Sequence, residues 1–512
     1  MSKNIIAAAA AGSPISTVPE GVAQGDKYRV GTLHYTLRQL VFLFTWLLFG
    51  NFCFIFFEQI FGRMMPLYLK QLHADNTVIG LLTGSIAGLV NVLFLPNISI
   101  ATDRLRSRMG RRIPFLLWST PCTVLSLMLI GYGPEISRWL HTTVPILRVF
   151  SLGAMTLVLL GLFTVSWHFF NMVLVNLFNF LVRDVVPQPL IARYVSLGTV
   201  INITASMLFT WFVFPHILIN RKIVCVVVGL IYLTAFMLMC WQVKEGEYPP
   251  PEPRPAGGFF GSYLKTFFTY FRECLSVPIY RDFVIVYALM VAAGSTTPFS
   301  LLFLKETIHL SMTEMGRVFT LGSLLSAIVV YPLGYLCNRI HAIRLMLAAL
   351  ICMAVGTLLS YFFINGLASW ILFIIITIAP STAWGLAFNT FMLKVFPAEK
   401  FGQFFSSINV LGFGSIFISN YLVGAFMDLV HSNYRLTFLI TFVCYAAMIP
   451  MLFMVYRHWR NHGGPDNYVP PLPRERVPNA ELRRGARVFF ILYADKKKGP
   501  PRPFNLCKSV NR

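Results

Sequence analysis

The sequence predicts an all-α polytopic membrane protein with 12 transmembrane helices, and three observations lead to this fold class. Hydrophobic residues make up 56% of the 512-residue chain and charged residues only 12%, about half the charged share of soluble domains. The mean hydropathy is +0.67. Apolar runs of membrane-spanning length, about 20 residues each, recur along the chain. A disordered chain or a set of soluble domains is therefore excluded.

The apolar runs form two groups of six, and a Pro-rich stretch at Tyr248–Gly258 lies between them. Such a stretch is typical of an extended linker. We divide the chain into an N-terminal tail (1–38), a first six-helix bundle (39–242), a linker (243–278), a second six-helix bundle (279–456) and a basic C-terminal tail (457–512). The expected spans are residues 39–62, 77–100, 113–133, 152–181, 194–218, 222–242, 279–303, 316–337, 343–364, 368–393, 404–428 and 434–456.

The linker contains an expected amphipathic helix. Its apolar side chains recur at helical spacing on one face, with charged and polar residues elsewhere, which favours a helix lying in the inner membrane interface. The apolar residues are Phe260, Leu264, Phe267, Phe268, Phe271 and Leu275.

The basic residues predict the orientation in the membrane. With this layout, 33 of the 42 Lys and Arg residues fall on the side that carries both tails. Because Lys and Arg collect on the cytoplasmic side, both termini and the linker are expected to be cytoplasmic in a multi-pass cell-membrane protein. The net charge of +22 then reflects topology and not nucleic-acid binding. The nine cysteines are scattered, so neither a metal site nor a disulfide framework is indicated.

The two groups of spans resemble each other. Phe178–Pro187 and Phe388–Pro397 both read F-N-x7-P, 210 residues apart, at the ends of spans four and ten. Ser99–Arg104 and Gly334–Arg339 correspond after spans two and eight. A 6+6 pseudo-repeat with a central cytoplasmic loop is the plan of a major facilitator transporter.

The loop after span two combines five arginines with one acid, Asp103, and with Gly110. An acid favours a helix N-terminus and cations favour C-termini. We therefore expect a conformational latch that binds helix ends across the seam between the halves. A plain positive-inside anchor explains the arginines equally well, but it does not explain the glycine or the order of the residues.

The segment from about residue 64 to residue 120 carries a resemblance to a known family. It has Pro66-x-Tyr-Leu at the end of span one and then D-R-x-R-S-R-x-G-R-R-x-P-F from Asp103. This segment resembles the glycoside–pentoside–hexuronide:cation symporters and their relatives, the proton–sucrose symporters. The resemblance implies coupled uptake of a sugar or glycoside. It also implies a cytoplasmic gating motif of Asp103, Arg104, Gly110, Arg111 and Arg112.

Further gating candidates come from the repeat and from the end of span four. These are Asn179, Asp184, Asn338, Arg339 and Asn389. Span two, which carries paired acids in sodium-coupled members of the family, has no acid here. A proton is therefore the expected coupling ion, and sodium is less expected.

Polar groups inside spans are functional candidates because they are costly in a bilayer. Glu58 in span one is the candidate for proton coupling, and Asn51 shares its helix face. His168 and Asn171 form a polar stripe in span four that is expected to bind a sugar. The repeat places Ser381 opposite Asn171, near Trp384, whose ring could hold a sugar or simply pack.

Two further features concern helix geometry. Gly294–Pro298 predicts a kink in span seven. Gly80, Gly84 and Gly88 predict a close-packed helix seam in span two.

The leading interpretation is a proton-coupled secondary transporter for a sugar or glycoside. A facilitator of another small organic solute and a non-transporting receptor or scaffold remain alternatives. An enzyme is not expected, because the outer loops offer only isolated acids and no nucleotide or hydrolase motif occurs. The expected partners are the substrate and membrane lipid, without nucleic acid, metal or cofactor, and the protein is expected to be a monomer.

Overall fold

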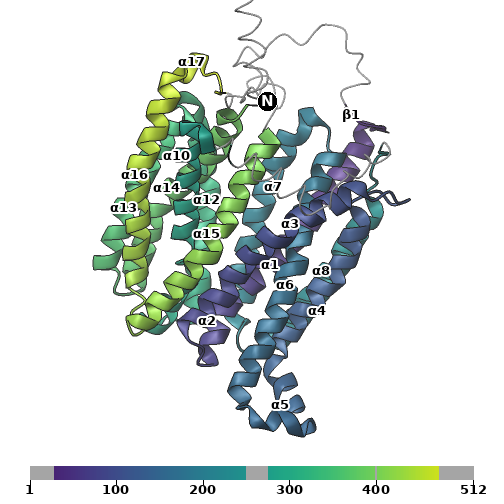
Figure 1. The fold of residues 1–512 in the computed structure, drawn as a ribbon, viewed down its shortest axis with the longest axis vertical. Coiled ribbons are helices and arrows are strands. Elements are labelled where there is room, and N and C mark those ends of the chain that lie inside the picture. Colours follow the sequence, from purple (N-terminus) through teal and green to yellow (C-terminus); the bar gives the residue numbers. More distant parts are fainter. Residues whose placement is uncertain (1–27, 249–271, 273–274, 398–400, 472–512) are drawn as a thin grey trace, which may run out of the picture. The chain divides into compact units, whose positions relative to one another are not determined.

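The computed structural model describes residues 28–248, 272, 275–397 and 401–471. Within these residues it contains twelve helices that are long and apolar enough to cross a membrane. This confirms the predicted fold class, and each expected span overlaps one of these helices (Figure 1). The expected amphipathic helix of the linker lies outside the described residues except for residues 272 and 275.

The first half begins with a two-stranded antiparallel hairpin and contains the first six spans. Its elements are β1 Arg29–Val30, β2 Leu33–His34, α1 Leu37–Gln71, α2 Asn76–Gly80, η2 Leu81–Ser85, α3 Ile86–Arg104, α4 Ile113–Gly131, α5 Gly133–Thr143, η3 Pro145–Val149, α6 Leu152–Val185, α7 Gln188–Leu208, η4 Phe209–Val213, η5 Phe214–His216 and α8 Arg221–Gln242.

The second half contains the remaining six spans and a short last helix. Its elements are α10 Pro278–Gly294, α11 Thr297–Leu302, η6 Phe303–Thr307, α12 Met312–Ile340, α13 Ala342–Phe363, α14 Leu367–Val395, α15 Phe401–Leu429, α16 Leu436–Asn461 and α17 Gly464–Asn467. The segments η2, η4 and η6 are single π-helical turns inside spans two, five and seven.

Local sequence signals set several helix ends. Thr36 and Gln39 form a capping box at the start of α1, in which the Gln39 N–H donates to Thr36 Oγ1 and the Thr36 N–H donates to Gln39 Oε1. Ser311 and Glu314 do the same at the start of α12. Such caps satisfy backbone N–H groups that have no partner within the helix.

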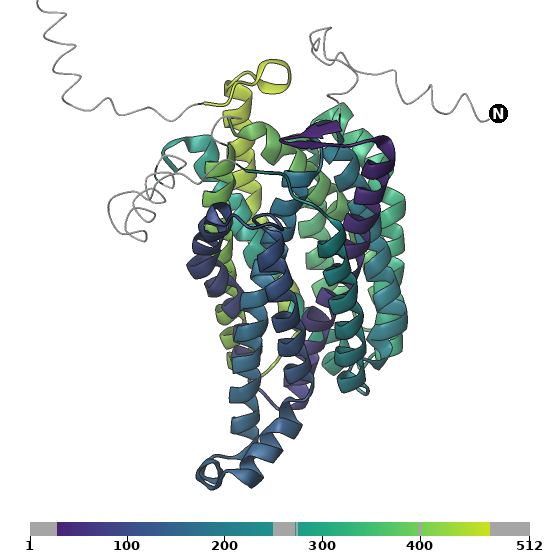
Figure 2. The same cartoon turned by 90° about the vertical axis from the view of Figure 1, so that its right-hand side faces the viewer.

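We name the two ends of the bundle by what they carry. The arginine-loop end carries residues 105–112, the start of α1 and the end of α16, and the opposite end carries the turn between α1 and α2 (Figure 1). The sequence did not predict α5, which lies at the opposite end, remote from the β1–β2 hairpin (Figure 2). There Glu135 pairs with Arg221 at 3.1 Å and Lys222 at 2.7 Å.

The hydrophobic cores show where the halves meet. One core contains the first half together with residues of the second half from the opposite end, such as Phe303, Met427 and Tyr434. A separate core fills the arginine-loop end of the second half and includes Phe283 and Trp459. The halves therefore share a core at the opposite end and have distinct cores toward the arginine loop.

The internal repeat is visible in the helix ends. Helix α6 ends at Val185 and α14 ends at Val395, which are 210 residues apart like the two F-N-x7-P segments. The residues that follow, Val186 and Phe396, are both extended. Each half also has a segment that leaves its sixth span and returns to the fourth: Tyr248 reaches the α6 end through Arg111, and the Tyr468 hydroxyl donates to Val395 O at 2.9 Å.

Candidate functional site

The arginine loop forms an ion-pair network with two acids. Arg111 binds Asp184 at the end of α6 through Nη2 at 2.8 Å and Nε at 3.1 Å. Arg112 binds Asp103 at 2.5 Å and approaches Asp184 at 3.4 Å. The structure thus brings together four of the predicted gating residues. All four belong to the first half, so in this conformation their network does not cross the seam as we expected.

Glu245 completes this network, and the sequence analysis missed it. Its carboxylate accepts hydrogen bonds from the backbone N–H groups of Arg111 at 2.9 Å, Arg112 at 2.8 Å and Ile113 at 2.8 Å. These are unpaired donors at the N-terminus of α4, where a negative charge is favourable. Glu245 therefore ties the segment after span six to the arginine loop. An acid placed just after a span, next to Lys244, was the available signal.

Tyr248 covers the same network. The Arg111 guanidinium lies 4.0 Å from its ring centroid, and its hydroxyl donates to Glu245 Oε2 at 3.3 Å. Burial acts to lower the pKa of Arg111, but the hydrogen bonds and charge of Asp184 outweigh it, so the pKa of Arg111 is raised. Burial, followed by the charges of Asp184 and Glu245, raises the pKa of Tyr248. Both groups therefore stay protonated over the physiological pH range.

The network explains why a glycine is needed at position 110. Gly110 has φ +105°, a conformation that side chains disfavour, and a Cβ there would lie 2.5 to 2.8 Å from side-chain atoms of Glu245. We expect Gly110→Ala to destabilise the protein by about 1–3 kcal/mol and to slow transport. Thermal unfolding of the purified protein measures the first effect. Gly153→Ala is the control, because nothing lies near its added Cβ, and equal unfolding temperatures for both variants would contradict the assignment.

Among the other predicted gating residues, Asn179, Arg339 and Asn389 lie outside this network. Asn179 is exposed, and its Nδ2 donates to Val175 O of its own helix at 2.9 Å. Arg339 and Asn389 are exposed. Arg104 is the last residue of α3, and the side chain of Asn338 lies outside the described part of the structure.

A second group of predicted residues lies within the spans of the first half. Glu58 on α1 lies near Asn171 on α6. Asn171 is buried, and its Oδ1 has no hydrogen-bond partner among the described residues. Asn51 on α1 donates to Asn202 Oδ1 on α7 at 2.6 Å. The structure therefore brings Glu58 and Asn171 together, and it adds Asn202, which the sequence analysis did not single out.

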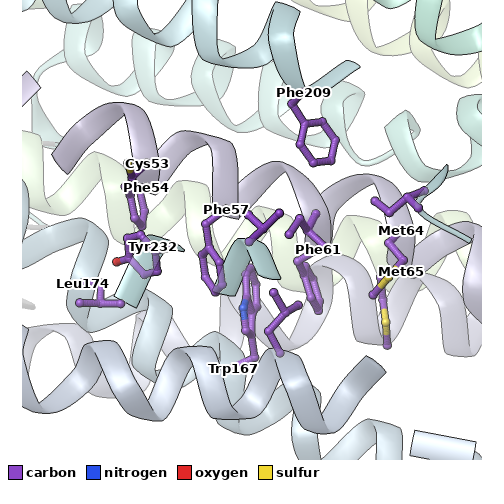
Figure 3. Close-up of a cluster of buried hydrophobic side chains, with 14 of the residues drawn as sticks. Cys53, Phe54, Phe57, Phe61, Met64, Met65, Trp167, Leu174, Phe209 and Tyr232 are labelled. Atoms are coloured by element: carbon purple, nitrogen blue, oxygen red, sulfur yellow. The ribbon is translucent and has the colours of Figure 1, made fainter. Parts of the chain in front are cut away.

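His168 does not face an open site as predicted. It is 6% exposed, and its Nε2 lies 3.0 Å from the carbonyl oxygen of Leu82 in η2. Its ring packs against Phe61 and Trp167, and Trp167 stacks on Phe61 with the ring centroids 3.7 Å apart (Figure 3). One ring nitrogen is therefore already bonded to the backbone, and the neighbouring indole is part of the core.

The predicted ligand residues of the second half do not join this group. Trp384 is 4% exposed in the core of the second half and stacks on Phe388. Ser381 is exposed, and its Oγ donates to Ile378 O of its own helix at 3.1 Å. The structure therefore places Trp384 among packing residues, which is one of the two roles expected for it, and binding of a sugar by its ring stays a prediction.

A cavity of about 340 Å³ lies between spans one, five and six. Its walls are almost entirely apolar and include Phe52, Leu208 and Ile231. A sugar needs hydrogen-bonding partners for its hydroxyl groups, so this cavity is not the polar site.

The halves are joined at the opposite end by an acid that the sequence analysis treated as isolated. Asp428 on α15 accepts four hydrogen bonds: from the N–H and Nδ2 of Asn76, both at 2.8 Å, and from the N–H and Oγ1 of Thr77 at 2.8 and 2.6 Å. The Tyr434 hydroxyl donates to Asn76 Oδ1 at 2.7 Å. The carboxylate thus caps α2, in the first half, from the second half. We call this cluster of Asn76, Thr77, Asp428 and Tyr434 the opposite-end gate.

The glycines of span two form the predicted seam. A Cβ at Gly80 or Gly84 would collide with Asn420 on α15, and a Cβ at Gly88 would lie 2.5 Å from Phe413 O. Beyond the seam, Leu93 and Phe94 on α3 are exposed. The seam is therefore tightly packed along Gly80, Gly84 and Gly88.

The predicted kink in span seven is confirmed. Helix α10 ends at Gly294 and α11 begins at Thr297. At this break Ser295 Oγ accepts from Asn420 Nδ2 at 3.0 Å, and Thr296 Oγ1 lies 2.8 Å from Thr441 Oγ1. The break thus contacts the helix that carries Asp428.

Twelve spanning helices in two repeated bundles, closed against each other at one end only, define a membrane transporter and not an enzyme. The family model described as Major Facilitator Superfamily matches residues 47–420 and, in a second match, residues 283–494. The chain belongs to the Major Facilitator Superfamily.

Solved structures share this fold. A bacterial homologue of the human lysosomal transporter Spinster, in an inward-facing and unoccupied conformation, has a TM-score of 0.63 at 14% identity and covers 85% of this chain and 100% of its own. A bacterial homologue of the iron transporter ferroportin, in an inward-facing state, has a TM-score of 0.59 at 15% identity, and the match covers 82% of this chain and 99% of that one. A nucleoside transporter has a TM-score of 0.58 at 13% identity, and the match covers 81% of this chain and 100% of that one. The comparison with curated sequences found no match.

Proposed function

We propose that the protein is a proton-coupled symporter of a sugar or glycoside that works by alternating access. One observation carries this proposal: a carboxylate, Glu58, lies near a buried amide, Asn171, whose Oδ1 has no hydrogen-bond partner among the described residues, inside the membrane-spanning part of the first half. Ionisable groups at such depth are costly, and transporters use them to bind and release protons.

The Asn171 amide suits both protonation states of Glu58. An ionised carboxylate can accept a hydrogen bond from the Asn171 amide nitrogen. A protonated carboxyl has a donor, and Asn171 Oδ1 is an acceptor with no partner among the described residues. A hydroxyl of the substrate could donate to the same oxygen. Proton and sugar would thereby act on one amide, which links their binding.

The amide pair of Asn51 and Asn202 extends the polar surface along α1. Each amide can donate and accept at once, as sugar hydroxyls do. Asn51 lies seven residues before Glu58 on α1 and so shares its helix face. This proposed site consists of Asn51, Glu58, Asn171 and Asn202, and it replaces the predicted site that included His168, Ser381 and Trp384.

The charge distribution also suggests how the protein is oriented in the membrane. With the arginine-loop end and both termini cytoplasmic, as the charge distribution favours, the opposite-end gate is extracellular and the described conformation is inward-open. The resemblance of residues 64–120 to the glycoside–pentoside–hexuronide:cation symporters and to the proton–sucrose symporters supports the substrate class. A monomer in the cell membrane suffices, because each chain contains both bundles.

Uptake into proteoliposomes tests the proposal. Purified protein should accumulate one or more members of a panel of labelled mono- and disaccharides and aryl glycosides when the outside is acidic, whereas an inward sodium gradient at equal pH should not support accumulation. Empty liposomes are the control. Uptake that equilibrates without responding to either gradient would overturn proton coupling in favour of a facilitator, and no uptake of any panel member would overturn the substrate class.

A further inference from the structure

Each π-helical turn leaves one backbone carbonyl without its usual partner. In η2 the Ile86 N–H bonds to Leu81 O and not to Leu82 O. In η4 the Phe214 N–H bonds to Phe209 O, and in η6 the Ile308 N–H bonds to Phe303 O. An α-helix would have used the carbonyl one residue later. The freed carbonyls are those of Leu82, Thr210 and Leu304.

These three carbonyl oxygens have different neighbours in the structure. Leu304 O accepts from the Leu310 N–H at 3.0 Å, in the loop that follows η6. Thr210 O faces Gly316 on α12, where a Cβ would lie 2.5 Å from it. Leu82 O lies 3.0 Å from His168 Nε2, a side chain from another helix. Because a carbonyl can only accept, Nε2 carries the hydrogen in this pair. His168 therefore provides the partner that the helix itself lacks at Leu82.

The turn at η2 sits between the proposed site and the gate. Asn171, of the proposed site, lies three residues after His168 on α6, on the same helix face. Gly84 of η2 packs against the Asn420 side chain on α15. Asn76 and Thr77, which bind Asp428, lie one to two turns before η2. A change in the conformation of η2 would therefore alter the packing of Gly84 against Asn420 and also the hydrogen bonds to Asp428.

We propose that His168 is a positioning residue that sets the opposite-end gate by holding the π-helical turn of span two. The turn contains one residue more than an α-helix would. If it relaxed to α-helix, residues 76–80 would rotate by about 100° and shift by about 1.5 Å. Asn76 and Thr77 would then leave the Asp428 carboxylate, and the gate would open. This inference depends on alternating access between the halves and not on the nature of the substrate.

The test compares variants that keep or remove the donor. His168→Gln retains an N–H that can reach a carbonyl, whereas His168→Phe keeps an aromatic ring for Phe61 and Trp167 but has no donor. Spin labels at positions 71 and 433, exposed on the two sides of the gate, report its opening by pulsed electron spin resonance in nanodiscs. The labels are placed in a cysteine-free background that still folds as a monodisperse protein.

We expect His168→Phe to raise the ratio of open to closed gate about tenfold, as the loss of one buried hydrogen bond would, and His168→Gln to keep the parental distribution. Asn176→Leu is the matched control, because Asn176 bonds only Met172 O on its own helix. Equal distance distributions for the Phe and Gln variants would overturn the proposal. So would the loss of folding in both, which would make His168 a packing residue alone.

Discussion

Asp428→Ala is expected to shift the protein strongly toward a conformation in which the opposite-end gate is open. The substitution removes four hydrogen bonds, and the carboxylate caps the first turn of α2 from across the seam. Bonds to a charged acceptor and the loss of a cap together suggest a net effect of about 3 kcal/mol on the closed state, which corresponds to a ratio change of roughly 100-fold. Transport should fall accordingly, since the carrier must close this end in each cycle.

Distance measurements between labels at positions 71 and 433 would measure the shift. Asp428→Asn should give an intermediate result, because it keeps one acceptor oxygen and loses the charge. Asp75→Asn is the matched control: Asp75 precedes α2 directly, but its side chain makes no capping hydrogen bond. An Asp428→Ala protein with the parental distances and transport rate would show that the cluster does not hold the gate.

Glu58→Gln is expected to abolish accumulation driven by a proton gradient while retaining exchange of the substrate. The amide has nearly the shape of the protonated carboxyl, but it cannot bind or release a proton. Its nitrogen can donate to Asn171 Oδ1 as the protonated acid would, so the loaded carrier should still change conformation. Without proton release, net uphill uptake should fall to the level of empty liposomes.

The measurement compares counterflow of labelled substrate with uptake under an acidic exterior in the same proteoliposomes. Glu306→Gln, which alters an exposed acid at the opposite end of span seven, should leave both unchanged. Normal accumulation by Glu58→Gln would assign proton coupling to another group. Loss of both activities would instead make Glu58 a substrate ligand.

The fold could be predicted because its signals are local. Each span is a continuous apolar run, and its length is set by the thickness of the bilayer. The glycine seam of span two and the break at Gly294 could likewise be recognised from residues that are close in sequence. Helix α5 could not, since it is short and amphipathic and lies in a loop where no apolar run marks it.

The interactions that cross between segments could not be predicted in the same way. Asp428 caps a helix that begins 352 residues earlier, and no local pattern reveals such a partner. His168 was expected to bind a ligand because it is a polar residue in an apolar span. Its partner, the Leu82 carbonyl, is available only because span two contains a π-helical turn, and a backbone carbonyl has no signature in a sequence.

For the arginine motif, the residues that interact could be predicted, but the helices that they join could not. Its residues were identified together, and Asp103, Arg111, Arg112 and Asp184 do meet. The prediction that this motif binds helix ends across the seam was wrong for this conformation. The spacing of the charged residues indicates that they form ion pairs, but it does not indicate which helix provides the partner. Glu245, which fixes the loop through three backbone bonds, was outside the motif.

The position of Glu245 has a consequence for biosynthesis. A membrane protein is made from its N-terminus, and domains tend to fold as they emerge. When span six has been made, the first turn of α4 still lacks the acceptor for its three N–H groups, since that acceptor is three residues further along. The first bundle is therefore finished only when the segment through Tyr248 has left the ribosome. Fragments that end at residue 242 should be poorer folding units than fragments that end just after 248.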